Sequence, residues 1–162
     1  MKTAIIAPYS SKLPDGKRNP KDWHDWVPFI TLMKNAGYYI IQIGTSGEAK
    51  LDGVNEHRLN LSFLELEGLL RDNPFSKKTI ISVDSFLPHF CAYHKIAPIH
   101  VVWGQSDYKI FGYPIHNNIT KDYPNYLRPG KEQYFLWTMC EYKEEAFPTA
   151  QEVMDKIVLD NP

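Results

Sequence analysis

Residues 79–94 combine a short apolar run, a polar turn and a helix-like segment in that order. The run at 80–83 is β-branched and apolar apart from one serine, which is typical of a strand buried on both faces of a parallel sheet. Asp84 and Ser85 end the run, and Ser85 is a good N-cap for a following helix. Ligands of open α/β sheets bind beyond the carboxyl ends of the strands, and a helix N-terminus attracts anions. We therefore expect an anionic ligand here, facing His89 in the first helical turn.

Strand-like and helix-like segments alternate along most of the chain. Apolar runs predict strands at 3–7, 39–43, 58–61, 80–83 and 99–103. Such alternation with parallel crossovers predicts an α/β fold with a three-layer, Rossmann-like parallel sheet. The length of 162 residues fits one domain, 1–162, with no internal repeat.

The first helix is expected to begin at Asn19-Pro20, an N-cap followed by proline at the first helical position. Pro28 then falls inside the helix, where it costs a hydrogen bond and bends the axis. Trp23 and Trp26 recur at helical spacing and are expected to be core residues rather than ligand-stacking rings.

Two later helices carry capping signals. Ser62 and Glu65 form a predicted capping box, and Thr149 with Glu152 starts a final helix. The buried faces are expected to contain Phe63, Leu66, Leu69 and Leu70 in the first of these helices and Val153, Ile157 and Val158 in the second. The stretch 104–120 is expected to be a loop, and 133–139 a further apolar segment.

Charge and cysteine content exclude several classes of function. Eighteen basic and nineteen acidic residues give a net charge of -1, so no global field attracts nucleic acid or an anionic membrane. The mean hydropathy is -0.39, and neither a signal peptide nor a membrane span is expected. Cys91 and Cys140 have neither metal-ligand nor disulfide spacing. We expect a cytoplasmic protein without a metal or cofactor.

The loop at 8–19 contains the residue types that a diphosphate needs. It offers small hydroxyls at Ser10 and Ser11 and positive charge at Lys12, Lys17 and Arg18. A solvated surface loop is the alternative. Neither a P-loop nor a Gly-x-Gly-x-x-Gly fingerprint is present in the sequence.

A longer pattern joins these features. The order is strand, Asp-Ser-x-x-x-His at 84–89, helix, a strand at 99–103, and then Gly-x-x-Asp ending at Asp107. This order resembles the nucleotide-sugar-binding, C-terminal half of the heptosyltransferase-like glycosyltransferases, family 9 of the GT-B fold. The resemblance extends over roughly residues 3–119. The family has glycine where this chain has Phe86, and a glycine allows the backbone to approach a phosphate more closely.

The resemblance implies roles for individual residues. Glu48 is at the position of the acidic residue that binds the ribose, although an exposed turn glutamate is the alternative. Asn60 and Leu61 precede the helix start and are expected to pack against the base. Ser85, Phe86 and His89 are expected near the diphosphate. Asp84, itself an anion, is expected to fix the turn or to accept a hydrogen bond from a sugar or ribose hydroxyl.

The implied activity is glycosyl transfer from a nucleoside-diphosphate sugar, ADP- or UDP-linked, without a metal. In the family an acceptor domain precedes the donor domain and supplies the catalytic carboxylate, whereas this chain begins at the donor domain. A partner chain or a second copy is therefore expected to complete the reaction.

The alternatives are a non-catalytic nucleotide or nucleotide-sugar binding module, and an assembly protein that has lost the site. A Ser/His/Asp hydrolase is disfavoured because Gly-x-Ser-x-Gly is absent from the sequence. The base, sugar and acceptor stay open.

Overall fold

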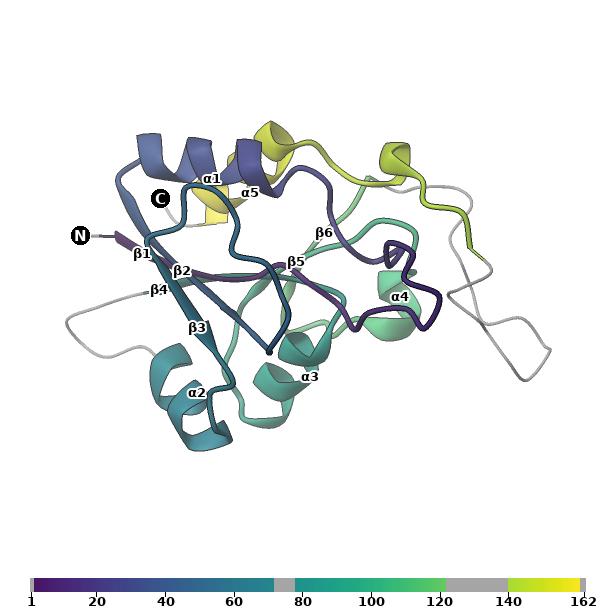
Figure 1. Cartoon of the computed structure of the whole chain (residues 1–162). Helices are drawn as coiled ribbons and strands as arrows, with labels where there is room; N and C mark the ends of the chain where they lie inside the picture. Colours follow the sequence, from purple (N-terminus) through teal and green to yellow (C-terminus); the bar gives the residue numbers. More distant parts are fainter. Residues whose placement is uncertain (1, 72–77, 122–139, 161–162) are drawn as a thin grey trace.

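A fully parallel, six-stranded sheet forms the centre of the molecule (Figure 1). The computed structural model describes residues 2–71, 78–121 and 140–160. The strands are β1 (Lys2–Ala7), β2 (Tyr38–Gly44), β3 (Glu56–Leu59), β4 (Lys78–Val83), β5 (His100–Val102) and β6 (Asn117–Ile119). Their order across the sheet is β3-β2-β1-β4-β5-β6. This order confirms the predicted Rossmann-like α/β fold, with β3 at one edge.

Helices cover both faces of the sheet. They are α1 (Trp26–Asn35), α2 (Phe63–Leu70), α3 (Phe86–Tyr93), the short α4 (Tyr108–Phe111), a 3-10 turn at Glu144–Ala146, and α5 (Ala150–Asp160). Figure 1 shows α1 and α5 above the sheet and α2, α3 and α4 below it. The predicted three layers are therefore confirmed.

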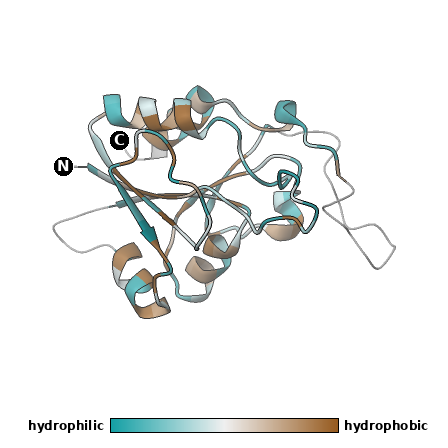
Figure 2. Ribbon diagram, in the orientation of Figure 1, coloured by the Kyte–Doolittle hydropathy of each residue, from teal (hydrophilic) through white to brown (hydrophobic). Residues whose placement is uncertain are grey.

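Two apolar cores are formed because successive side chains of each strand point to opposite faces. Along β1, Ala4 and Ile6 pack with α1 and α5, whereas Ile5 packs with α2 and α3. β4 divides in the same way, with Ile81 on the first side and Ile80 on the second. Each fully buried aliphatic side chain of this kind contributes about 1.5–3 kcal/mol. Figure 2 shows hydrophobic residues on α1, α2 and α3.

The predicted start of the first helix is wrong. Residues 20–25 form turns, and α1 begins only at Trp26 after the N-cap Asp25. Pro28 consequently lies in the first turn, where N–H groups have no intrahelical partner, so it costs no hydrogen bond. Trp23 and Trp26 are core residues as predicted, at 2% and 3% exposure.

The later helices confirm the capping signals but not every buried position. Ser62 and Glu65 form the capping box of α2. Phe63 and Val158 are exposed, although both were expected to be buried. The predicted loop at 104–120 contains α4 and the parallel strand β6, because Asn117–Ile119 pairs with β5. The predicted apolar segment at 133–139 lies outside the described residues.

Two glycine substitutions test this packing with opposite signs. A Cβ at Gly104 would overlap the buried ring of Phe147. Gly104→Ala should therefore lower the free energy of unfolding by about 1–3 kcal/mol. Gly68 is on the exposed side of α2 with no atom near an added Cβ, so Gly68→Ala should raise it by about 0.5–1 kcal/mol. Urea denaturation measures both variants, and a change in the same direction for the two would contradict this packing.

Candidate functional site

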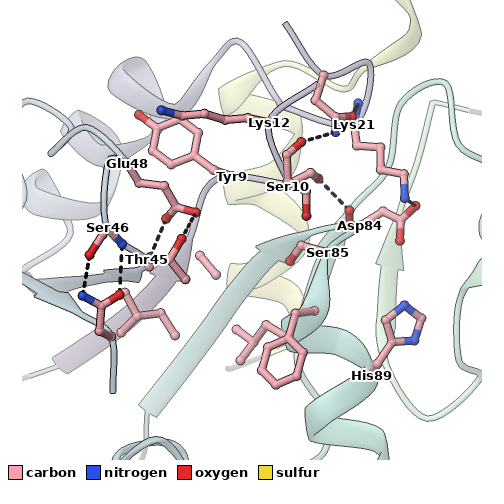
Figure 3. A pocket seen from close by; sticks show the side chains of 18 of the residues that line it. Tyr9, Ser10, Lys12, Lys21, Thr45, Ser46, Glu48, Asp84, Ser85 and His89 are labelled. Carbon is pink, nitrogen blue, oxygen red and sulfur yellow. Dashed lines mark hydrogen bonds and ion pairs between the residues drawn. The ribbon is translucent and has the colours of Figure 1, made fainter. Parts of the chain in front are cut away.

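A pocket of about 940 Å³ opens at the carboxyl ends of β1, β2 and β4. It lies where the strand order reverses, since β2 and β3 follow on one side of β1 and β4 lies on the other. Ligands of open α/β sheets bind at such switch points. The loops after β1, β2, β3 and β4 each supply part of its wall (Figure 3).

Most of the residues predicted for a binding site line this one pocket. They are Ser10, Ser11, Lys12, Glu48, Asn60, Leu61, Asp84, Ser85, Phe86 and His89. Residues that sequence reasoning did not select also line it, among them Tyr9, Lys21, Thr45, Ser46 and Phe63. Lys21 had been placed in a predicted helix and Phe63 in a buried helical face. Thr45 and Ser46 could have been selected from the sequence, because they are polar residues that come just after a predicted strand.

Three residues predicted for the site lie outside the pocket lining. The Lys17 ammonium is 3.3 Å from the Asp15 carboxylate. The Arg18 guanidinium lies over the ring of Tyr142, 4.3 Å from its centroid. Asp107 is buried and caps α4 by accepting a hydrogen bond from the Lys109 N–H.

The buried Asp84 carboxylate connects three loops. Its Oδ2 lies 3.1 Å from Lys21 Nζ and accepts a hydrogen bond of 2.7 Å from the Ser106 hydroxyl. The Asp84 carbonyl accepts another from the Ser10 hydroxyl, at 2.8 Å. The side chain is only 5% exposed, so removing Lys21 would leave a buried charge at a cost of about 3–5 kcal/mol. These contacts fix the turn, which is one of the two roles expected of Asp84.

Glu48 is held over the end of β2 by its own turn. Its carboxylate accepts hydrogen bonds from the Thr45 N–H at 3.0 Å and from the Thr45 hydroxyl at 3.1 Å. A Cβ at Gly44 would overlap this carboxylate, so the close approach requires glycine. The fully buried Gln42 holds the rest of the loop through the Ala49 carbonyl and the Leu51 N–H.

Asn60 joins the loops that follow β2 and β3. It has a left-handed backbone with φ of 56°, which asparagine adopts more readily than most residues. Its side-chain oxygen accepts a hydrogen bond from the Ser46 N–H, and its amide donates to the Ser46 hydroxyl at 2.7 Å. The Asn60 amide therefore holds Ser46 in place, and both residues line the pocket.

Lys12 and the start of α3 supply positive potential. Lys12 Nζ donates to the Gly47 carbonyl at 3.1 Å and so spans the loops after β1 and β2. Ser85 is the N-cap residue of α3, but its side chain makes no capping bond. It lies instead 3.2 Å from the Ser82 hydroxyl. The Ser85 side chain does not cap the N–H groups of Phe86 and Leu87, and Pro88 has none to donate, so the start of α3 is an uncapped helix N-terminus of the kind that attracts anions.

His89 lies at the pocket edge and is oriented by Tyr113. Its Nδ1 is 2.8 Å from the Tyr113 hydroxyl, and the two rings meet edge to face. Tyr113 follows α4 in the stretch 104–120, which was expected to be a loop, and it was not among the predicted site residues. The contact joins residues 24 positions apart and has no local signal in the sequence.

Within the described parts of the chain, no group of three or more His, Cys, Asp or Glu side chains is placed to hold a metal ion. Over the same residues, the helices are all too short or too polar to cross a bilayer.

Comparison with known proteins bears on the fold. Neither a protein-family model nor a curated protein matches the sequence. A solved structure that does match is the bacterial iron-containing dodecameric glycosyltransferase TibC from enterotoxigenic E. coli H10407. The TM-score is 0.68 at 16% identity, over 98% of this chain and 46% of that one. The two proteins share this fold, and the present chain spans about half the length of its neighbour.

Asp22, which follows the loop at 8–19, makes the free energy of unfolding depend on pH. It accepts a hydrogen bond from the Ser10 N–H at 2.8 Å, yet burial raises the pKa of its carboxyl to about 6. The ionised form is thus disfavoured in the folded protein, and its cost is present above pH 6 and is lost as the pH falls toward 4. Asp22→Asn keeps the acceptor oxygen, so it should raise the free energy of unfolding by about 1–3 kcal/mol at pH 8. Thermal melts from pH 8 to pH 4 should show the gain shrinking.

Asp15→Asn is the matched control. The Lys17 N–H donates to the exposed Asp15 carboxylate and lowers its pKa, so this variant should lose a little stability at neutral pH. An Asp22→Asn gain that is equal at pH 8 and pH 4 would contradict the role assigned to burial.

Proposed function

We propose that this chain binds a nucleoside-diphosphate sugar and provides the donor half of a metal-independent glycosyl transfer reaction. The observation that carries the proposal is the pocket at the switch point of the sheet. Ser10 and the start of α3 lie on one side, and Lys12 and Glu48 lie on the other, where Lys12 Nζ donates to the Gly47 carbonyl (Figure 3). The fold shared with a bacterial glycosyltransferase supports the same reading. The Asp-Ser-x-x-x-His pattern leads us to propose a heptosyltransferase-like, GT-B C-terminal domain.

The proposed chemistry depends on the negative charge of the departing diphosphate. Glycosyl transfer breaks the bond between the sugar and this group, and interactions that strengthen as charge develops lower the barrier. The Lys12 ammonium, the first N–H groups of α3 and His89 are proposed to supply them. Charge-assisted hydrogen bonds contribute roughly 1.5–3 kcal/mol each.

Glu48 is proposed to bind the ribose. Its carboxylate accepts two hydrogen bonds from Thr45 and retains lone pairs for a vicinal diol, because an ionised carboxylate has about four acceptor sites. Because Thr45 holds the Glu48 carboxylate in place, a ribose diol would meet an acceptor that is already oriented.

The acceptor-side base is proposed to come from another polypeptide. Glu48 and Asp84 are the carboxylates that line the pocket within the described residues, and both are already bound to neighbouring groups. The chain spans 46% of the neighbouring glycosyltransferase, which is dodecameric. A partner chain or a second copy would supply the missing group. The same observation favours a second candidate, a binding module that holds the nucleotide-sugar without transferring it.

Nucleoside diphosphates should stabilise the folded protein. At a concentration one hundred times the dissociation constant, the gain in free energy of unfolding should be about 2.7 kcal/mol. A thermal-shift series with ADP-, UDP- and GDP-sugars measures it. Absence of any shift at millimolar nucleotide or nucleotide-sugar would refute the proposed function.

Two lysines of the same loop separate the pocket from the general surface. Lys12→Gln should weaken nucleoside diphosphate binding by about tenfold to one hundredfold, because it removes one charge-assisted hydrogen bond. Lys17→Gln removes the same charge outside the pocket lining, from a side chain that is 69% exposed. It should leave the affinity nearly unchanged. Calorimetric titration of both variants measures this, and equal losses would indicate attraction by overall charge rather than a built site.

A further inference from the structure

Two phenylalanine rings form a wall of the pocket without being buried. Phe63 and Phe86 are the first residues of α2 and α3, and both line the pocket. Their ring centroids are 5.8 Å apart with an interplanar angle of 16°, so the rings stack. They nevertheless remain 67% and 54% exposed. We call this stacked pair the aromatic wall.

The aromatic wall is supported from within. The ring of Phe90, which is buried, lies 5.8 Å from Phe63 and 5.5 Å from Phe86. The capping box of Ser62 and Glu65 fixes the start of α2 and with it the position of Phe63. A platform that is ordered before binding loses little conformational entropy when a ligand arrives.

The pocket around the wall is apolar, unlike the part beside Lys12. Four aliphatic lining residues pack in or against the same core cluster as Phe90, namely Ile43, Leu61, Leu66 and Leu87. Asn60, an amide of the same lining, is held by Ser46 through its oxygen and one of its two N–H groups, so that its direction is fixed and one N–H is left by these two bonds. A ligand group placed here meets flat apolar surface and few side chains that could read its polar edges.

We propose that the aromatic wall holds the nucleobase by stacking alone, so that the protein prefers purine over pyrimidine nucleotides and does not distinguish adenine from guanine. This inference rests on the proposed function. It follows because stacking on an aromatic ring depends on the area of the base, whereas discrimination between bases of equal size needs directed hydrogen bonds.

A base suits this surface better than the donor sugar does. A sugar also has an apolar face, but its hydroxyl groups surround the ring, and some would lie against aliphatic side chains without a partner. A base has two apolar faces, and its polar edge can stay in the open mouth of the pocket. The sugar is therefore assigned to the polar side.

The first experiment compares the affinities of ADP, GDP, UDP and inorganic pyrophosphate by calorimetric titration of the full chain. ADP and GDP should agree within about threefold, and both should bind about fivefold or more tightly than UDP. Pyrophosphate has no base, so its affinity reports binding on the polar side of the pocket alone.

The second experiment substitutes each phenylalanine of the aromatic wall in turn. Phe86→Leu and Phe63→Leu keep apolar volume but remove the flat face, so each should weaken ADP by about fivefold to tenfold and reduce the preference over UDP. Neither should change pyrophosphate binding. Tyr93→Leu is the control, since Tyr93 is an exposed aromatic residue of the same helix α3 outside the pocket lining, and all affinities should stay unchanged. Both phenylalanine side chains are largely exposed, and a thermal melt verifies that each variant folds.

Three results would overturn the inference. An ADP affinity that differs from that of GDP by tenfold or more would indicate recognition of the base edge. Equal affinities for ADP and UDP that neither phenylalanine substitution changes would show that the wall does not bind the base, while retained pyrophosphate binding would leave the proposed function intact. If pyrophosphate and every nucleotide fail to bind, the proposed function fails and the inference fails with it.

Discussion

The buried ion pair between Asp84 and Lys21 is the interaction on which the pocket depends. A carboxylate that is only 5% exposed is tolerated because Lys21 and Ser106 satisfy it, and these partners come from the loops after β1 and β5. Ser10 binds the carbonyl of the same residue. The positions of the three loops are therefore coupled, since displacing any one of them would leave a buried polar group unpaired. The polar wall of the pocket is consequently formed before a ligand arrives.

Five of the six strands were predictable from the sequence, because a short β-branched run such as 80–83 is stable only when both of its faces are covered. The strand β6 was not predicted, because Asn117–Ile119 contains no apolar run. The start of α1 could not be predicted from local signals. Trp23 donates its indole N–H to the Pro148 carbonyl at 2.9 Å, and Trp26 donates to the Pro8 carbonyl at 3.2 Å. These distant partners position both rings, and the segment before Trp26 follows them rather than the Asn19-Pro20 signal.

The site was predictable to the level of loops but not of individual side chains. The rule that ligands bind at the carboxyl ends of strands selected the loop containing Lys12 and Lys17. The choice between the two lysines depends on a turn within the loop, closed by the Gly16 N–H and the Leu13 carbonyl, after which Lys17 pairs with Asp15. Phe63, the first residue of α2, lines the pocket and stacks on Phe86, which lies on another helix. Helical periodicity contains no information about that contact.

The presence of phenylalanine at position 86 changes how the pocket can bind an anion. A glycine there would allow close backbone approach and contribute no side chain, whereas the Phe86 ring stacks on Phe63 and remains exposed at the pocket. The two rings therefore leave apolar area open to the pocket. A planar group seated on them would exclude water from the pocket that also contains Lys12. Since attraction between charges strengthens as the local dielectric constant falls, the apolar side of the pocket would then reinforce the charged side.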